Sequence, residues 1–389
     1  MEEHMTRPET LSSRYFSDFN VGDHLYHGKI EIRPIVNSNY IRMFGDNNQL
    51  AANLALAEHL RLVNPELLRT QALYSATSSG MVNQVLLFNM VFGQTVQDVS
   101  FHGFANLFYR DWRFGAPVFV GDTIESSSGV LATGVQRDGA SSGSVTVRTT
   151  AYNQRGEMVL TYIRSVLVRG KPGESYAQKN PEVEPPKDID WESAVIPLTY
   201  NHLDPSLLGS DGKTFEEFSA GVKYKGTFES SIPLEHSVWL QTATQNGSLV
   251  HASPNAGFIV YGGSVIATAM AQISGLMPLA YIVGVKQGTH ENPTYPGDIV
   301  QLLYPNEEGE HEQIRTAIEV LGVNWQLEDI GVLTAKLTAE KKVTGAGREM
   351  LQKYAKGSLE KIMQYSDGEF LPVLGLEMVL ALPKRAAFE

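Results

Sequence analysis

An internal repeat divides this chain into two similar halves, and it limits the possible folds more than any other feature. Three pairs of short segments occur in the same order in both halves, at offsets of 199, 200 and 176 residues: 16–22 with 215–221, 44–48 with 244–248, and 116–123 with 292–299. A single pair arises easily by chance, but three in the same order do not. The repeat therefore predicts a duplicated domain whose second copy is shorter.

Both halves show the same succession of elements. Each has a mostly apolar stretch followed by runs in which apolar and polar residues alternate. The apolar stretches are 67–91 and 262–275, and the alternating runs are 144–152, 159–168, 314–321 and 332–338. Alternation is typical of half-buried antiparallel strands, so each half is expected to be a sheet wrapped around one apolar helix. The predicted fold class is α+β.

The domain limits follow from the repeat and from one polar segment. Segment 171–191 is rich in Pro, Glu, Lys and Asp and has no apolar period, so we expect an extended, exposed connector. The predicted division is a first domain at 12–170, a linker at 171–211 and a second domain at 212–389. Near the C-terminus, 348–365 has the spacing of an amphipathic surface helix, and 371–382 is expected to form a final strand.

Composition excludes several classes of protein. The 389 residues include no cysteine, which rules out disulfides, thiolate metal sites and a cysteine nucleophile, and agrees with a cytoplasmic location. A formal charge of −12 argues against a nucleic-acid partner. The longest apolar stretch, 258–281, is interrupted by Gly, Ser, Gln and Pro, so no membrane span is expected. No signal peptide is evident at the N-terminus.

Several strings carry a resemblance to a known family. They are VFGQTVQDVS at 91–100, the run 105–123, NQRGEMVL at 153–160, QN at 245–246, VH at 250–251, IVYGG at 259–263, HENP at 290–293 and PGD at 296–298. With these strings the chain resembles MaoC-like enoyl-CoA hydratases of double hot-dog architecture, and within them the mesaconyl-CoA hydratases (β-methylmalyl-CoA dehydratases). The resemblance covers about 15–170 and 212–340. It implies two antiparallel sheets, joined edge to edge, each wrapped around a central apolar helix.

The catalytic motif of such hydratases, Gly-Asp-x-Asn-Pro-x-His, is divided between the halves. The first half keeps Asp46 but has Ala51 at the histidine position. The second half keeps His251 and has Asn246 at the aspartate position. The resemblance therefore implies that His251 is the acid/base and that Asn246 holds water or the thioester oxygen by hydrogen bonds. An imidazole titrates near neutral pH, as this role requires. The structural alternatives are a core histidine and a helix cap.

Further residues are assigned to the same site. Backbone N–H groups of Gly262 and Gly263, at the start of the apolar helix, would stabilise the enolate-like oxygen of the thioester, with Ser264 as an additional donor. The glycines would otherwise form a strand-to-helix turn. Gln245, Tyr261 and His290 are expected to line the substrate pocket.

Asp46 is the candidate for a residual site in the first half, although a helix cap in a degenerate copy is the favoured interpretation of this residue. Asp122 and Asp298 lie in Gly-Asp turns, where aspartate has a structural role. No histidine pair has metal-ligand spacing, so no metal is predicted.

Two departures from the family pattern bear on the substrate. Thr244 and Ser264 stand where the family tends to have Tyr and His. Arginines common before the IVYGG string are replaced by NAGF at 255–258. Because arginine is the natural partner of a carboxylate, their absence counts against a dicarboxylic acyl group such as mesaconyl.

The combined prediction is a hydro-lyase that hydrates an enoyl thioester, mesaconyl-CoA-like or another short or branched acyl-CoA. Coenzyme A would enter as part of the substrate, with Lys286 as a candidate for its phosphates, and no other cofactor is expected. The first half would form one wall of the acyl tunnel. Two alternatives stay open: a dehydratase or oxygen-addition cyclase acting on an acyl-carrier-protein thioester, and a non-catalytic acyl-thioester binding protein. A homo-oligomer is the default expectation.

Overall fold

The computed structural model describes most of the chain. The described residues are 13–62, 80–181, 191, 194, 196–252, 259–294, 314–342 and 370–389, of which 249, 314, 324, 325, 342 and 370 are described by their backbone only. The predicted surface helix at 348–365, segment 255–258 and Asp298 lie outside these residues.

Within the described ranges, each half contributes five strands and one long buried helix. In the first half the elements are β1 (His24–Glu31), α1 (Pro34–Phe44), α2 (Gln49–Ala52), α3 (Leu54–His59), α4 (Gln84–Thr95), a π-helical turn (Val96–Ser100), β2 (Gly103–Phe114), β3 (Thr123–Gly134), β4 (Ser142–Tyr152) and β5 (Met158–Arg169). In the second half they are β6 (Lys223–Lys225), α5 (Leu234–Ala243), α6 (Leu249–Ala252), α7 (Gly262–Ser274), β7 (Tyr281–His290), β8 (Ile314–Gln326), β9 (Ile330–Lys342) and β10 (Phe370–Pro383).

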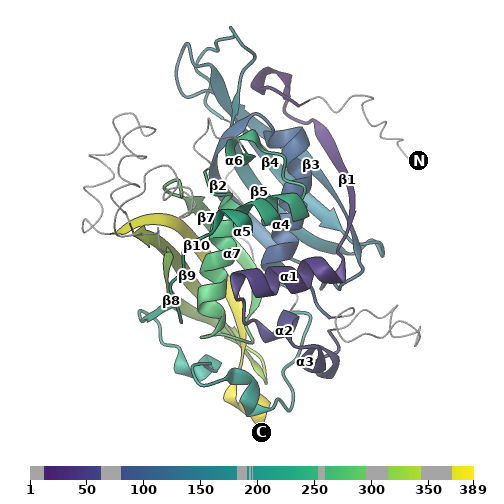
Figure 1. Cartoon of the computed structure of the whole chain (residues 1–389), viewed down its shortest axis with the longest axis vertical. Helices are drawn as coiled ribbons and strands as arrows, with labels where there is room; N and C mark the ends of the chain where they lie inside the picture. The colour runs from purple at the N-terminus through teal and green to yellow at the C-terminus, as the bar shows by residue number, and fades with distance from the viewer. Residues whose placement is uncertain are drawn as a thin grey trace.

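The strands form one antiparallel sheet in the order β1-β3-β4-β5-β2-β7-β10-β9-β8-β6. The second half repeats the strand order of the first in reverse, and β2 pairs with β7 at the centre, with Tyr109 opposite Gly288. Figure 1 shows α4 and α7 side by side against one face of this sheet, with α1 and α5 crossing them. The predicted edge-to-edge union of two helix-wrapped sheets is confirmed, and it protects two strand edges that would otherwise be exposed.

Equivalent local structures occur at corresponding positions of the two halves. Two 3₁₀ turns, Phe16–Asp18 and Phe215–Glu217, have an acidic side chain that accepts from the N–H three residues earlier, at 3.0 and 2.9 Å. Gly45 and Gln245, which end α1 and α5, both have left-handed backbones, with φ of 68° and 58°. These correspondences support the duplication predicted from the sequence.

The central helices are buried because their sequences are apolar on all sides. Every residue of α4 is buried, as expected for a helix enclosed by a sheet and other helices. Of the predicted apolar stretch 67–91, residues 67–79 lie outside the described residues, and in the rest the helix starts at Gln84. Asn83 sets this start, because its Oδ1 accepts from the N–H groups of Val85 and Leu86 at 3.0 and 3.2 Å. None of the helices in the described ranges has both the length and the apolar character to cross a membrane.

The predicted linker, 171–211, behaves differently in its two parts. Its start, up to residue 181, is mostly exposed, as expected. Farther along, Leu198, Tyr200 and Leu203 are buried in a hydrophobic cluster, and the Tyr200 hydroxyl donates to the Leu279 carbonyl. The exposure predicted for 171–191 thus agrees with the described start of that segment, whereas the apolar residues of the later part cover the end of the second-half sheet.

Candidate active site

A cavity of about 370 Å³ lies between the two halves. That volume is within the usual range for a small-molecule site. The first half supplies walls from α4, β2 and β5, and the second half supplies α6, the start of α7 and the end of β7. The residues used below that line it are Asn106, Tyr109, Arg164, Asn246, His251, Tyr261, Gly262 and His290. Five of the predicted site residues therefore meet in one cavity.

His251 is held in one tautomer by the backbone. Its Nδ1 lies 2.8 Å from the Ile259 carbonyl oxygen, which can only accept, so Nδ1 carries the proton in the neutral ring. Nε2 is then left with a free lone pair. Burial lowers the pKa of His251 from its usual 6.5, and the bond to Ile259 offsets this only in part. A neutral imidazole with a free Nε2 is the form that can accept a proton from water.

Asn246 combines a structural contact with a free donor. Its Oδ1 accepts from the Ser248 N–H at 3.1 Å, in the turn just before the short helix α6 that carries His251. Its Nδ2 is buried and has the Tyr261 hydroxyl as its neighbour on the cavity wall. The bond to Ser248 fixes the amide orientation, since only Oδ1 can accept, so the NH₂ group is the part that faces a ligand.

Gly262 and His290 lie against each other on the second-half wall. A Cβ added at Gly262 would stand 2.8 Å from Nε2 of His290, so only glycine fits beneath this ring. The Gly262 N–H begins α7 and has no hydrogen-bond partner within the described segments. Nε2 of His290 lies 3.3 Å from the Tyr109 hydroxyl. Burial lowers the pKa of His290 to about 4, with nearby His251 as a further cause, so this ring is neutral near pH 7.

Three predicted residues do not line the cavity. Gly263 packs against α4, where an added Cβ would overlap Asn89 Oδ1 and the Tyr261 ring. The Ser264 hydroxyl is fully buried without a described partner, and its N–H donates to the Tyr261 carbonyl at 2.8 Å. Gln245 is exposed, because its left-handed backbone turns the chain at the end of α5. Their predicted roles as thioester or pocket residues therefore lack geometric support.

Asn106, Tyr109 and Arg164 line the cavity although the sequence did not predict them as site residues, and the charged one among them is Arg164. It lies on β5, is 1% exposed and lines the cavity from the first half. The available signal was one charged residue within the otherwise uncharged run 158–168. A lone charge in an alternating strand usually faces solvent, so the signal was not used.

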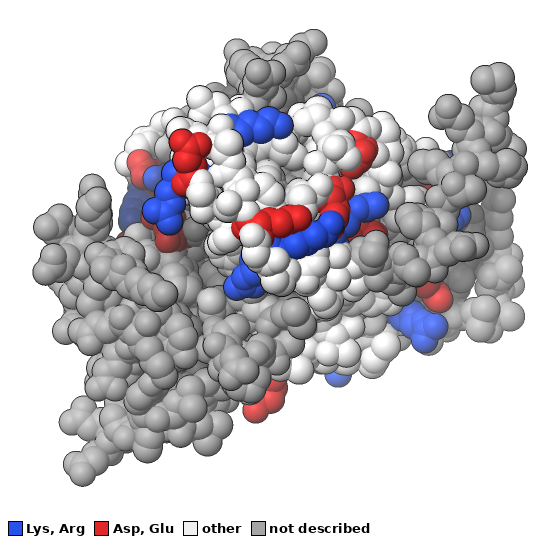
Figure 2. Space-filling view, turned by 90° about the horizontal axis from the view of Figure 1, so that it is seen from above, with Lys and Arg blue, Asp and Glu red and all other residues white. Residues whose placement is uncertain are grey.

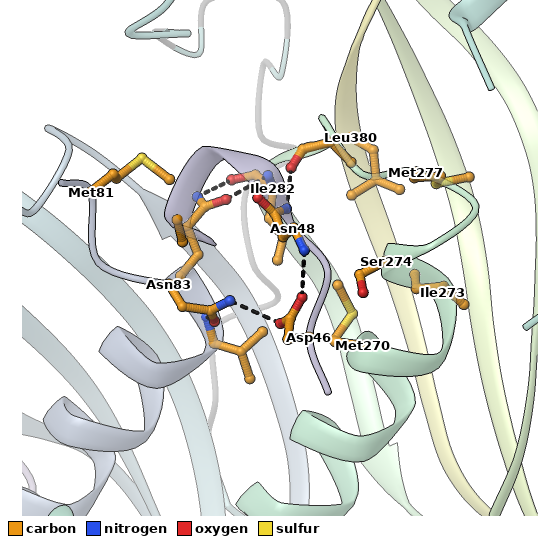
Figure 3. Close-up of a pocket in the computed structure, with 14 residues that line it drawn as sticks. Asp46, Asn48, Met81, Asn83, Met270, Ile273, Ser274, Met277, Ile282 and Leu380 are labelled. Atoms are coloured by element: carbon orange, nitrogen blue, oxygen red, sulfur yellow. Dashed lines mark hydrogen bonds between the residues drawn. The ribbon is translucent and has the colours of Figure 1, made fainter. Parts of the chain in front are cut away.

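The Asp46 site is closed (Figure 3). Its cavity holds about 30 Å³, enough for about one water molecule. Asp46 accepts hydrogen bonds from the Asn48 N–H at 2.9 Å and from Asn83 Nδ2 at 2.8 Å. Ala51 lines the cavity at the position equivalent to His251. This geometry favours the structural interpretation of Asp46 over a residual catalytic site.

A glutamine, Gln84, lines the small cavity at the position that corresponds to Gly262 in the large one. Gln84 is the first residue of α4, as Gly262 is of α7. Its side chain donates to the Ile282 carbonyl and accepts from the Ile282 N–H, both at 2.8 Å. Methionine side chains from both halves fill the remaining space; they are Met81, Met270 and Met277.

The other candidates have structural partners. Asp122 accepts from the Phe119 N–H at 3.0 Å and pairs with Arg155. Lys286 pairs with Glu377 at 3.6 Å and does not line the cavity, so it is not placed to bind coenzyme A there. Within the described segments, no group of three or more His, Asp or Glu side chains has the arrangement of a metal site.

A ten-stranded sheet with two central helices, and a histidine-bearing cavity between its halves, defines a double hot-dog protein. Two solved structures show the same fold: a putative MaoC domain protein dehydratase from Chloroflexus aurantiacus and a Mycobacterium tuberculosis protein described as having a double hotdog fold. The first has a TM-score of 0.76 at 22% identity and covers 97% of this chain and 100% of its own. The second has a TM-score of 0.68 at 17% identity and covers 95% and 98%.

Sequence relatives show the family. The mesaconyl-CoA hydratase of Cereibacter sphaeroides is 30% identical over 300 residues, which is 75% of this chain and 83% of the relative. The beta-methylmalyl-CoA dehydratase of Chloroflexus aurantiacus is 27% identical over 304 residues, 75% and 81% of the two chains. No family model matches the sequence. The chain belongs to the MaoC-like double hot-dog hydratases and dehydratases and is a hydro-lyase.

Proposed function

We propose that the protein reversibly adds water to the double bond of a short or branched enoyl thioester of coenzyme A, at the cavity between its halves. One observation carries this assignment: the Ile259 carbonyl holds the proton of His251 on Nδ1 and leaves Nε2 free in that cavity. The relatives act, by their names, on mesaconyl-CoA and β-methylmalyl-CoA.

In the proposed hydration, Nε2 of His251 takes a proton from water as the hydroxyl oxygen bonds to the β-carbon. The electron pair of the double bond moves toward the thioester carbonyl, and the α-carbon then receives a proton from the imidazolium. Nδ2 of Asn246 is available to hold the water. The N–H of Gly262 is available to stabilise the enolate-like oxygen, and the start of α7 favours negative charge there.

We place the coenzyme A portion near Phe104. This residue lines the cavity yet is 36% exposed, so it marks an opening. The Arg169 guanidinium lies 5.1 Å above its ring, which puts a cation beside that opening. Such a cation is suited to the phosphates of coenzyme A. An acyl-carrier-protein thioester remains the second candidate, and a non-catalytic binding protein the third.

The test is an enoyl-thioester assay. Purified protein is mixed with mesaconyl-CoA or crotonyl-CoA, and the loss of conjugated enoyl-thioester absorbance is followed. We expect turnover that His251→Ala abolishes, while the exposed His24→Ala serves as matched control and retains it. Binding of either thioester without turnover by the wild-type protein would support the non-catalytic alternative. No binding and no turnover would favour a carrier-protein substrate.

A further inference from the structure

Arg164 is a buried cation whose contacts leave its charge uncompensated. Its Nη2 donates to the hydroxyl groups of Thr95 and Ser100 at 2.8 and 3.2 Å. Its Cζ lies 4.3 Å above the Phe92 ring. These neutral contacts fix the position of the guanidinium group, but they supply no full negative charge.

No acidic side chain in the described part of the chain forms an ion pair with Arg164, and its Nε is buried without a partner. Glu291 also lines the cavity, but it is exposed at the end of β7. Burial lowers the pKa of Arg164, with the neighbouring tyrosines as an opposing cause, yet a guanidinium stays protonated in proteins. A buried charge without a counter-charge is costly, so a ligand that supplies one would be bound preferentially.

The duplication indicates that the fold itself does not need this charge. In the first half Tyr109 pairs with Arg164, and in the second half the equivalent pair is Val285 with Met378. Met378 is 1% exposed, so a long apolar side chain fits this strand position. Asn106 likewise corresponds to Ile282, which lies in the closed cavity of Figure 3. The open cavity thus has polar groups where the closed one has apolar groups.

We propose that Arg164 is a specificity residue that binds a carboxylate on the acyl group of the substrate. This inference rests on the proposed enoyl-thioester hydratase function and narrows it to acyl chains that carry a free carboxylate. A guanidinium fork matches the two oxygens of a carboxylate. The side-chain amide of Asn106 also lines the cavity, and neither its Oδ1 nor its Nδ2 has a described partner, so its Nδ2 is available as a further donor to the carboxylate. Arg164 thereby replaces the arginine that the sequence lacks at 255–258, from the opposite wall.

The experiment compares Arg164→Met, which copies the second-half residue, with Arg137→Met, an exposed arginine in the turn after β3. Succinyl-CoA and butyryl-CoA, which are saturated and are not hydrated, are titrated against each protein by calorimetry. The ratio of kcat/KM for mesaconyl-CoA over crotonyl-CoA is measured alongside. Arg164→Lys keeps the charge without the fork, and thermal unfolding checks that every variant is folded.

We expect the wild-type protein to prefer the carboxylate ligand and substrate, and Arg164→Met to reduce both preferences by about 100-fold, the usual effect of removing a charged hydrogen-bond partner. Arg164→Lys should retain part of the preference, and Arg137→Met all of it. Equal losses for both ligands, or a wild-type preference for butyryl-CoA, would overturn the inference. Hydration of crotonyl-CoA alone would overturn it and leave the hydratase function standing. Preferential binding of succinyl-CoA without any turnover would support the carboxylate site and refute the hydratase function.

Discussion

His251 and Ala51 occupy equivalent positions in the two halves, and so do Asn246 and Asp46. A cavity of about 370 Å³ surrounds the first of each pair, against about 30 Å³ around the second. The difference follows from the neighbouring residues, because Gln84, Met81, Met270 and Met277 line the small cavity, whereas Gly262 lines the large one. One duplicated motif has thus produced one open site and one packed site.

The acidity of His251 predicts a pH profile. The neutral ring is the proposed base, and burial lowers its pKa below 6.5. The value of kcat/KM should therefore be constant above pH 6.5, and fall about tenfold per pH unit only below the lowered pKa of His251. Initial rates at several pH values test this. An acidic limb centred above 6.5 would contradict the environment assigned to His251.

His290 predicts how stability depends on pH. Its pKa is about 4 in the folded protein against an ordinary 6.5, so the unfolded chain binds more protons between these values. The free energy of unfolding should be highest above pH 6.5 and fall by on the order of 2–3 kcal/mol as the pH drops to 4. Urea unfolding at several pH values measures this. The His290→Gln variant should show a smaller change of the unfolding free energy with pH. If its change equals that of the wild-type protein, the pH dependence does not come from His290.

Asp46→Asn tests the closed site. Asp46 lines a different cavity from the proposed base and contacts Asn48 and Asn83, so we expect unchanged kcat/KM for any substrate that the wild-type protein turns over. Asparagine has nearly the same size as aspartate, so the variant should fold, and a circular dichroism melt checks that it does. Loss of activity with the fold intact would give the first half a catalytic role.

At the scale of elements, the strands could be predicted and the start of α4 could not. The runs 144–152 and 159–168 became β4 and β5 with nearly the same limits, because alternation reports directly on a half-buried strand. The apolar stretch at 67–91 predicted a buried helix but not its first residue, since an apolar run contains no signal for where a helix begins. Only the bonds from Asn83 fix that point.

The site was predictable where the motif survives and not where the two halves meet. His251 and Asn246 follow from the residue pattern of the second half. Arg164 reaches the cavity because β5 pairs with β2 and because its guanidinium lies over Phe92 of α4. These contacts join segments far apart in the sequence, so no local residue pattern predicts them. Gly263 illustrates the opposite case, a motif residue that serves packing.

The packing of α4 against α7 predicts a stability defect for Gly263→Ala. An added Cβ would overlap Asn89 and the Tyr261 ring, and overpacking in a core costs about 1–3 kcal/mol. Guanidinium unfolding should therefore show a loss of that size. Gly322→Ala, in β8, where the backbone is not left-handed and nothing lies within 4 Å of the new Cβ, controls for glycine replacement in open space. Equal stability of Gly263→Ala and the wild-type protein would refute the tight contact.

On the scale of the whole molecule, the cavity exists only because both halves build it. α4, β2 and β5 face α6, α7 and β7 across the central β2–β7 pair. Figure 2, which views the molecule from above, shows acidic and basic side chains lying beside each other, with no broad basic area on the described part of the face in view. This mixed surface agrees with a small-molecule substrate that reaches an internal cavity.

Separating the halves should therefore abolish activity. Residues 1–195 and 196–389, expressed alone, each lack part of the cavity wall and expose a strand edge. We expect neither fragment to hydrate an enoyl thioester, and co-expression to restore turnover through the β2–β7 pair. Size-exclusion chromatography and the enoyl-thioester assay measure both effects. Activity in the second fragment alone would show that the first half is not a wall of the site.

The most direct test of the central claim is the rate of enoyl-thioester absorbance loss for the wild-type protein, His251→Ala and Asp46→Asn, measured side by side. The account predicts turnover by the wild-type protein and Asp46→Asn, and a loss of at least about 100-fold for His251→Ala, as for other general acid–base residues. Undiminished turnover by His251→Ala, or loss in Asp46→Asn alone, would contradict the placement of the active site in the cavity between the halves.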